Sequence, residues 1–151
     1  MDQTRLNVKS SPFQNQIHGK FQPNELLPPL IIKQLASLFI VPDDCQGQTI
    51  LFEKFVFGYK RNNIFILNPY EVFFLNQIQT DASLIHIENF QNPSEIGGND
   101  SKKLWNYCCS LFPPTIFPIQ YAVYHFFRCR FWVVRDGSIF GALFVLYQDL
   151  P

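Results

Sequence analysis

Hydrophobic and polar positions along the first two thirds of the chain predict a mixture of helices and strands. Residues 30–39 carry apolar side chains at a spacing that predicts a short helix after a double proline. Residues 49–60, "TILFEKFVFGYK", and 63–68, "NIFILN", are rich in β-branched and aromatic residues, which favour short strands. Residues 83–90, "SLIHIENF", predict another strand by the same criterion.

A capped helix is predicted in "NPYEVFFLNQIQ", residues 68–79. Asn68 is a favourable N-cap residue, and Pro69 suits the first helical turn. Glu71 stands three residues after the cap, where its carboxylate can complete a capping box.

Residues 91–103, "QNPSEIGGNDSKK", have no apolar periodicity and contain Pro93, Gly97 and Gly98. This composition is typical of a linker, so we place a domain boundary near residue 98. Residues 1–22 are polar and unpatterned and are predicted to be a flexible tail. The expected organisation is a tail, an N-terminal domain over 23–98 and a C-terminal domain over 99–151, within an α+β fold.

The second half predicts two helices followed by a hairpin. The first helix, in "SKKLWNYCCSLF", stops before Pro113 and Pro114, and the second lies in "FPIQYAVYHFFRCRF", residues 117–131. The second helix has one apolar face, made of Ile119, Ala122, Val123, Phe126 and Phe127. Its other face carries Tyr121, Tyr124, His125 and Arg128. A hairpin is predicted over 132–147, with Asp136 and Gly137 at its turn.

The last predicted strand, 139–147, is apolar on both faces. We therefore expect other elements to pack on both of its faces and a neighbouring strand to pair with each of its edges. Within 99–151 only "WVV", residues 132–134, is available to pair with it. A segment of this size is too small to bury that surface alone. We therefore expect this half to be an incomplete domain, or one that another chain completes.

Composition narrows the class of protein. The chain of 151 residues is 47% hydrophobic and 16% charged, which is enough apolar content for a folded core. Its formal net charge is zero, so a nucleic-acid partner would be held by a local basic patch or a companion subunit. The start lacks the apolar core of a signal peptide, and the longest apolar run is too short for a bilayer. These features predict a soluble, intracellular protein without a membrane partner.

No metal or cofactor is expected. The cysteines at 45, 108, 109 and 129 form no C-x-x-C pair, and adjacent Cys108 and Cys109 are poorly spaced for one tetrahedral metal. Reduced and mostly buried thiols are the simpler interpretation. The chain also has no phosphate-cradling glycine loop and no nucleotide fingerprint.

A family resemblance is carried by "YAVYHFFRCRFWVVRDGSIFGALFVLY", residues 121–147. This segment resembles the helix-to-strand signature of the tRNA-splicing endonucleases, also called tRNA-intron lyases. That signature has Tyr-x-x-Tyr, an Arg one turn later, aromatic-Val-Val, a glycine turn, aromatic-Gly and Phe-x-x-Tyr. Its positions are filled here by Tyr121, Tyr124, Arg128, Trp132, Val133, Val134, Gly137, Phe140, Gly141, Phe144 and Tyr147.

Two further segments resemble the same family. "LNPYEVFFLNQ" is similar to the helix of the family's N-terminal domain, and "KLWNYCCSLFP" is similar to the segment that opens the nuclease domain of the eukaryotic catalytic subunit. The likeness covers roughly residues 50–151. It implies a small N-terminal α/β domain and an incomplete C-terminal domain of the tRNA-intron-endonuclease, restriction-endonuclease-like type.

The resemblance implies a metal-free transesterification on precursor tRNA, in a nuclear complex with other endonuclease subunits. A Tyr takes the proton of the 2′-hydroxyl, a His protonates the leaving 5′-oxygen, and a Lys stabilises the transition state. The products are a 2′,3′-cyclic phosphate and a 5′-hydroxyl. By motif alignment the Tyr is Tyr147, and Arg128 and Arg130 are the expected RNA contacts.

This sequence departs from the family pattern in two ways. The His and Lys positions would fall beyond Pro151, and Leu143 stands where the family tends to have Asp. We assign none of His18, His86 and His125 the role of the acid, so the chain alone is expected to be inactive. Two alternatives stay open at this point: a non-catalytic interaction subunit of the same complex, and an unrelated α+β binding module.

Overall fold

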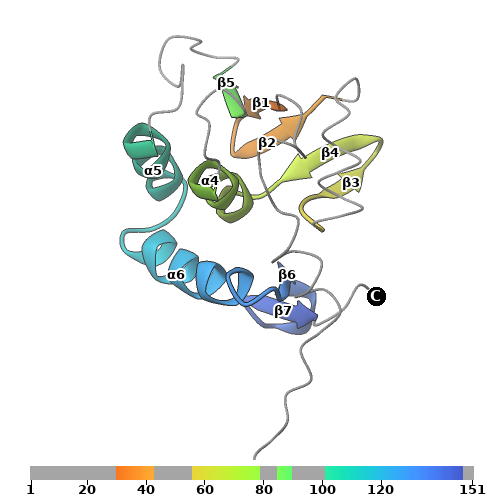
Figure 1. Ribbon diagram of the computed structural model, residues 1–151, viewed down its shortest axis with the longest axis vertical. Helices are drawn as coiled ribbons and strands as arrows, with labels where there is room; N and C mark the ends of the chain where they lie inside the picture. The colour runs from red at the N-terminus through yellow and green to blue at the C-terminus, as the bar shows by residue number, and fades with distance from the viewer. Residues whose placement is uncertain (1–29, 43–55, 79–84, 90–100, 148–151) are drawn as a thin grey trace, which may run out of the picture.

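The computed structural model describes residues 30–42, 56–78, 85–89 and 101–147 (Figure 1). Within these residues the chain forms two β-sheets and three α-helices, which confirms the predicted α+β fold class. The predicted tail at 1–22 lies outside the described residues. So does the predicted boundary near residue 98, and the division into two domains stays a prediction.

The larger sheet has five strands in the order β3-β4-β2-β1-β5. The strands are β1 (Leu30–Leu35), β2 (Leu38–Val41), β3 (Tyr59–Arg61), β4 (Ile64–Leu67) and β5 (Ile85–Asn89). β5 runs parallel to β1, and the other neighbours are antiparallel. Asn62 and Asn63 both have positive φ and link β3 to β4 in the way that a tight hairpin requires. The strands predicted in 63–68 and 83–90 are therefore confirmed. Of the strand predicted over 49–60, residues 49–55 lie outside the described residues, 56–58 are not strand, and Tyr59 and Lys60 belong to β3.

The helix predicted over 30–39 is wrong, because this segment is the hairpin of β1 and β2. Leu30, Ile32 and Gln34 are buried, while Ile31 and Leu35 are exposed, so burial follows the two-residue period of a strand. Apolar residues on both faces concealed that period in the sequence. Pairing of β1 with β2 on one edge and β5 on the other decides the outcome.

Helix α4 (Pro69–Ile78) begins as the sequence predicts. The Glu71 N–H donates to Asn68 Oδ1 at 2.9 Å, and the Asn68 N–H donates to Glu71 Oε2 at 2.9 Å. This reciprocal pair is the capping box, and it is confirmed. Most of the helix is buried between the large sheet and the other two helices (Figure 1).

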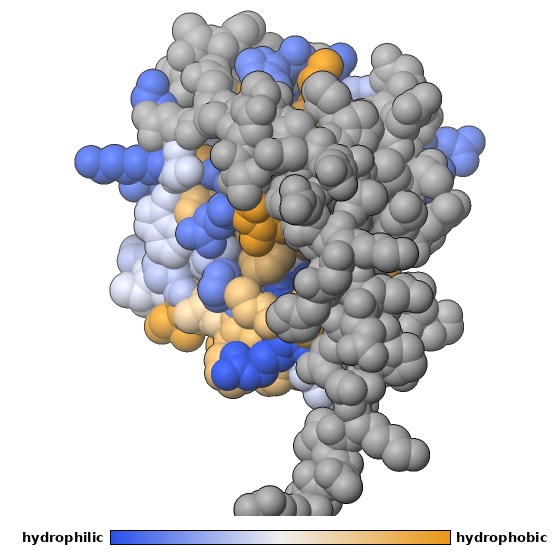
Figure 2. Space-filling model, in the orientation of Figure 1, coloured by the Kyte–Doolittle hydropathy of each residue, from blue (hydrophilic) through white to orange (hydrophobic). Residues whose placement is uncertain are grey.

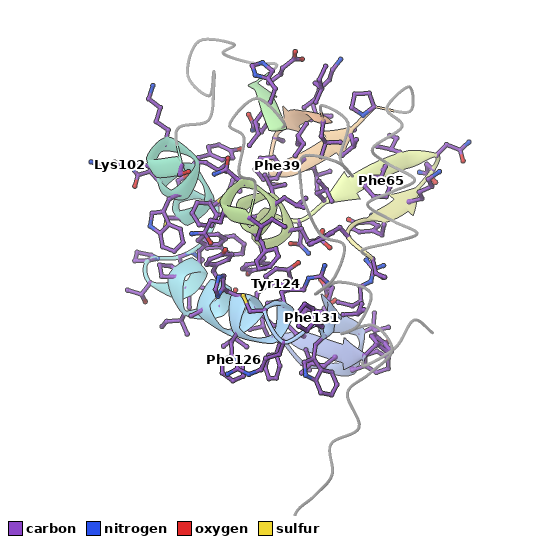
Figure 3. All side chains as sticks on the ribbon, in the orientation of Figure 1. Phe39, Phe65, Lys102, Tyr124, Phe126 and Phe131 are labelled. Carbon is purple, nitrogen blue, oxygen red and sulfur yellow. The ribbon has the colours of Figure 1, made fainter. Side chains whose placement is uncertain are left out.

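Helices α5 (Ser101–Ser110) and α6 (Ile116–Arg128) lie against α4, as Figure 1 shows. Both helices were predicted, but α6 packs through the face opposite to its aliphatic one. Tyr121 and Tyr124 point inward and are 6% and 1% exposed, whereas Ile119 is 63% exposed. In Figure 3, Tyr124 lies between α6 and α4, and Phe126 projects away from both.

The predicted hairpin exists, as β6 (Val133–Asp136) paired with β7 (Phe144–Tyr147), but its strand and turn differ from the prediction. β7 begins at Phe144 rather than at residue 139, and residues 137–143 form a loop that contains a 3-10 turn, η2 (Ser138–Phe140). The Gly137 N–H donates to the Leu143 carbonyl at 3.2 Å, and the Phe140 N–H donates to the Gly137 carbonyl at 2.8 Å. These bonds close the loop and take residues 139–143 out of the strand.

Aromatic rings dominate the core, which draws side chains from both halves of the chain. Tyr70 of α4 is the centre of this packing. Its ring centroid lies 5.4 Å from Phe117, 5.9 Å from Tyr124 and 5.4 Å from Phe144. The hairpin is thus attached to the helices through Phe144, which positions Tyr147 at the other end of the same strand.

Candidate functional site

Tyr147, the expected catalytic residue, is the last described residue of β7 and is partly exposed. It stands opposite Val133 in the register of the two-stranded sheet. The strand is short and twisted against one partner only within the described residues. Tyr147 is therefore held by β6, whose position follows from the end of α6.

Arg128, in the last turn of α6, is half buried and faces inward. Its guanidinium carbon lies 3.9 Å from the ring centroid of Phe57, and Nη1 donates to the Trp132 carbonyl at 3.3 Å. Trp132 directly precedes Val133, the partner of Tyr147. The side chain of Arg128 thus fixes the backbone just before β6. Because the next residue, Val133, pairs with Tyr147, this bond also helps to position Tyr147.

Arg130 lies in the turn after α6 and takes a different direction. It is exposed, its guanidinium carbon lies 3.5 Å from the ring centroid of Phe126, and Nη1 donates to the Phe126 carbonyl at 3.2 Å. The two arginines expected to contact RNA therefore rest on different elements. Arg128 supports the hairpin, whereas Arg130 covers the outer face of α6.

The two described histidines lie on elements other than the two strands of the hairpin. His86 is exposed on β5, opposite Ile31 of β1, and His125 is exposed on α6. The ring nitrogens of His125 lie 3.6 Å and 3.7 Å from the Cys129 sulfur. His18 lies outside the described residues. Neither described histidine is on β6 or β7, and the expectation that no histidine of this chain acts as the acid stays a prediction.

Glu71 has a second role that the sequence pattern does not reveal. Its carboxylate is 2% exposed, and Oε1 accepts the N–H of Gly58 at 2.9 Å in addition to the capping bond. Arg135 of β6 donates to the carbonyl oxygen of the same glycine. Burial raises the pKa of Glu71, opposed by the two backbone hydrogen bonds and by Arg135 and Arg128. The carboxylate links α4, the segment before β3 and the hairpin.

A pocket of about 700 Å³ opens beside α6, between α4 and α5, and was not predicted from the sequence. Its walls include Phe73, Trp105, Tyr121 and Phe126, with Gln77 and Arg130 as polar members. His125 and Cys129 also line it. They stand four residues apart on one helical face, and that spacing is the signal that could have indicated a shared site. Burial raises the pKa of the Tyr121 hydroxyl, which donates to Gln77 Oε1.

Among the described residues, no group of three or more His, Cys, Asp or Glu side chains lies close enough together to hold a metal ion. Cys108, Cys109 and Cys129 are free thiols, and burial raises the pKa of Cys108 to about 12. None of the described helices combines the length and the apolar character that crossing a bilayer requires.

Comparison with known proteins gives one informative match. No protein-family model matches the chain. The chain is 33% identical over 110 residues to the probable tRNA-splicing endonuclease subunit Sen2 of Oryza sativa subsp. japonica. The match covers 69% of this chain and spans about a third (34%) of the length of that relative. It argues against the alternative of an unrelated α+β module. The chain belongs to the tRNA-splicing endonuclease family.

Proposed function

We propose that this chain acts as a subunit of a nuclear tRNA-splicing endonuclease and takes part in the cleavage of precursor tRNA at intron boundaries. The observation that carries the proposal is the match to the rice subunit, together with the signature that ends at Tyr147. Other subunits of the complex are its protein partners. The expected products are a 2′,3′-cyclic phosphate and a 5′-hydroxyl.

In this proposal the phenolate form of Tyr147 accepts the proton of the 2′-hydroxyl at the splice site. The 2′-oxygen then attacks phosphorus and the bond from phosphorus to the 5′-oxygen breaks, while an acid protonates the leaving oxygen. The partly exposed end of β7 leaves Tyr147 accessible to a substrate. His86 and His125, the described histidines, lie on β5 and α6 and not on the strands of the hairpin. We expect the acid to come from outside the described residues, and the 151 residues by themselves not to cleave precursor tRNA.

Arg128 and Arg130 are proposed as RNA contacts of unequal accessibility. Arg130 is exposed and free to move from the ring of Phe126 to a phosphate. Arg128 is half buried over Phe57, so its main contribution is to hold the start of β6. Loss of Arg130 should weaken RNA binding directly, whereas loss of Arg128 should act through the hairpin.

A second candidate function within the same complex is a non-catalytic interaction subunit. The observation that favours it is Leu143, which occupies the position where the family tends to have Asp and is 44% exposed in the loop before β7. In that case β6 and β7 serve for docking to another subunit, and Tyr147 performs no chemistry.

The two functions separate in an assembled complex of this chain with its partner subunits. Tyr147→Phe should lower the rate of precursor-tRNA cleavage by about 100-fold or more, because a general base is removed. Tyr59→Phe, at an exposed tyrosine of β3, is the matched control and should cleave at the wild-type rate. Analysis of the product ends should show the cyclic phosphate.

Each other result has a clear meaning. An assembled Tyr147→Phe complex that cleaves at the wild-type rate would eliminate the catalytic role and leave the interaction subunit. A wild-type chain that assembles with no endonuclease subunit and binds no precursor tRNA would contradict the proposal as a whole.

A further inference from the structure

The pocket beside α6, here called the α6 pocket, has walls that are already held in place. The ring centroids of Phe73 and Trp105 lie 5.0 Å apart, those of Phe73 and Tyr121 also 5.0 Å, and those of Trp105 and Tyr121 5.8 Å. The hydroxyl of Tyr121 is held by Gln77. Phe73 and Tyr121 are 4% and 6% exposed, so they support the pocket from behind, and Trp105 and Phe126 present its accessible rings. Because the supporting rings are already fixed, receiving a flat ring needs little reorganisation.

The open side of the pocket combines a small residue with an aromatic one. Ala122 is exposed on α6 and leaves space in front of the aromatic wall. Phe126 is 48% exposed and forms the edge of the pocket beneath Arg130. In Figure 2, orange and blue side chains lie next to each other along the lower edge of the molecule, where Figure 1 places α6. An apolar surface large enough for a ring thus lies directly beside a cation.

The charged residues in the part of the chain that forms α5, α6 and the start of the hairpin are all basic. From Ser101 to Arg135 the sequence has five basic residues and no Asp or Glu. These five are Lys102, Lys103, Arg128, Arg130 and Arg135. Among the described residues that line the pocket none is acidic and Arg130 is the charged one, and Lys102 projects outward from α5 in Figure 3. Positive charge therefore lies at the pocket in Arg130 and on α5, one of the three helices that line it, which favours an anionic partner.

We propose that the α6 pocket binds an unpaired nucleotide of RNA, with the base against Trp105 and Phe126 and its phosphate on Arg130. Aromatic side chains stack on any base, and an adjacent arginine neutralises the phosphate. An acidic peptide would satisfy the charge but leave the ring-sized apolar space unused. The inference rests on the proposed function for the source of the RNA, and it adds a contact outside the two-stranded sheet of Tyr147.

Binding of a single-stranded oligoadenylate of about 8 nucleotides to the full chain tests the pocket directly, since single-strand sites span about 4–16 nucleotides. Ala122→Trp fills the space in front of the wall and should weaken binding about tenfold or more. Val123→Trp adds the same side chain at the next position of α6, which does not line the pocket, and should bind as the wild type does. Circular dichroism of both variants checks that the helix is retained.

A charge-matched pair tests the phosphate contact. Arg130→Gln should lower the affinity and reduce the slope of log affinity against log salt by about one phosphate contact. Arg61→Gln removes the same charge from exposed β3 and should leave both quantities close to those of the wild type. Bound oligoadenylate should also protect Cys129, at the wall of the pocket, from alkylation by iodoacetamide. Cys109, which does not line the pocket, is the internal reference.

Equal affinities of the Ala122→Trp and Val123→Trp variants, or of the Arg130→Gln and Arg61→Gln variants, would overturn the proposal. So would binding of a tryptophan-containing peptide in the pocket with no binding of the oligonucleotide. The proposed function is judged separately, by cleavage in the assembled complex. If Ala122→Trp abolishes oligonucleotide binding but the wild-type complex cleaves no precursor tRNA, the pocket stands and the proposed function fails. If the wild-type complex cleaves precursor tRNA but the Ala122→Trp variant binds the oligonucleotide normally, the proposed function stands and the pocket proposal fails.

Discussion

Glu71 accepts the backbone N–H of Gly58 at 2.9 Å, from a carboxylate that is 2% exposed. The bond joins the first turn of α4 to the segment that leads into β3. Arg135 of the hairpin donates to the carbonyl oxygen of the same glycine, so both polar groups of Gly58 are used. One residue, Gly58, therefore connects the segment before β3, the central helix and the hairpin that positions Tyr147.

Replacing Glu71 by Gln should lower the free energy of unfolding by about 1–3 kcal/mol. The amide keeps one oxygen acceptor, but its NH₂ group would face the N–H of either Gly58 or Asn68, which would lose its bond. Urea unfolding measures the change. Glu88→Gln, on the partly exposed part of β5, is the control and should change stability by less than about 0.5 kcal/mol.

The same variant should alter the dependence of stability on pH. Burial raises the pKa of Glu71 above its ordinary value of 4.5, so the folded protein holds this proton to a higher pH than the unfolded chain does. The contribution of Glu71 is then full below pH 4.5 and declines as the pH rises toward the folded-state pKa. The stability advantage of wild type over Glu71→Gln should narrow from pH 4.5 toward neutrality. A constant or widening difference would contradict the raised pKa.

Gly58 should tolerate no side chain. Its φ is +67°, and an added Cβ would lie 2.6 Å from a ring carbon of Phe65 and 2.8 Å from the Ile66 carbonyl oxygen. Gly141 has nearly the same φ, +68°, but nothing within 4 Å of an added Cβ. Gly141→Ala should therefore cost about 1–2 kcal/mol of unfolding free energy from backbone strain alone. Gly58→Ala should cost clearly more, and equal costs by thermal or urea unfolding would refute the steric argument.

Removing the hydroxyl from two neighbouring tyrosines should change the stability of the protein in different directions. Tyr124 is 1% exposed, and its hydroxyl has no hydrogen-bond partner among the described residues. Tyr121 donates to Gln77. Tyr124→Phe should leave stability unchanged or raise it by about 1 kcal/mol, because a buried unpaired polar group is removed. Tyr121→Phe should lower it by about 0.5–1.5 kcal/mol. Calorimetric unfolding of both variants, measured in parallel, tests these two expected changes in stability.

The described cysteines should react with an alkylating reagent in a fixed order. Cys129 is exposed, Cys109 is partly buried and Cys108 is buried with a pKa raised to about 12, so its thiolate is scarce at neutral pH. Burial also raises the pKa of Cys109 and Cys129, with Arg130 and Arg128 opposing it for Cys129. Site-resolved mass spectrometry should show Cys129 modified first and Cys108 only after unfolding. Early labelling of Cys108 would show that the α4–α5 packing opens readily.

Limited proteolysis tests the predicted boundary between the two parts of the chain. Cleavage within 92–100 should precede cleavage within 118–147, because the latter range contains α6 and the hairpin, which pack against the core through Tyr121, Tyr124 and Phe144. A first cut inside β6 or β7 would argue against the predicted organisation.

The sequence alone was sufficient for features whose interacting residues lie close together along the chain. The capping box of Asn68 and Glu71 is made by groups three residues apart, so it could be predicted before any fold was known. The helices before and after the double proline at 113–114, and the existence of the terminal hairpin, follow from equally local signals. Tyr147 was singled out by a motif, and the structure places it on the second strand of that hairpin.

Tertiary packing decided the features that depend on contacts between segments far apart in the sequence. β1 was predicted as part of a helix from the spacing of the apolar residues in 30–39, and its pairing with β5, more than fifty residues later, makes it a strand. α6 buries its tyrosines because their large rings fill the space beside Tyr70, which leaves the aliphatic face outside. The α6 pocket and the Gly58–Glu71 bond join three separate elements each. Such contacts depend on the shape of the assembled core, which no local pattern encodes.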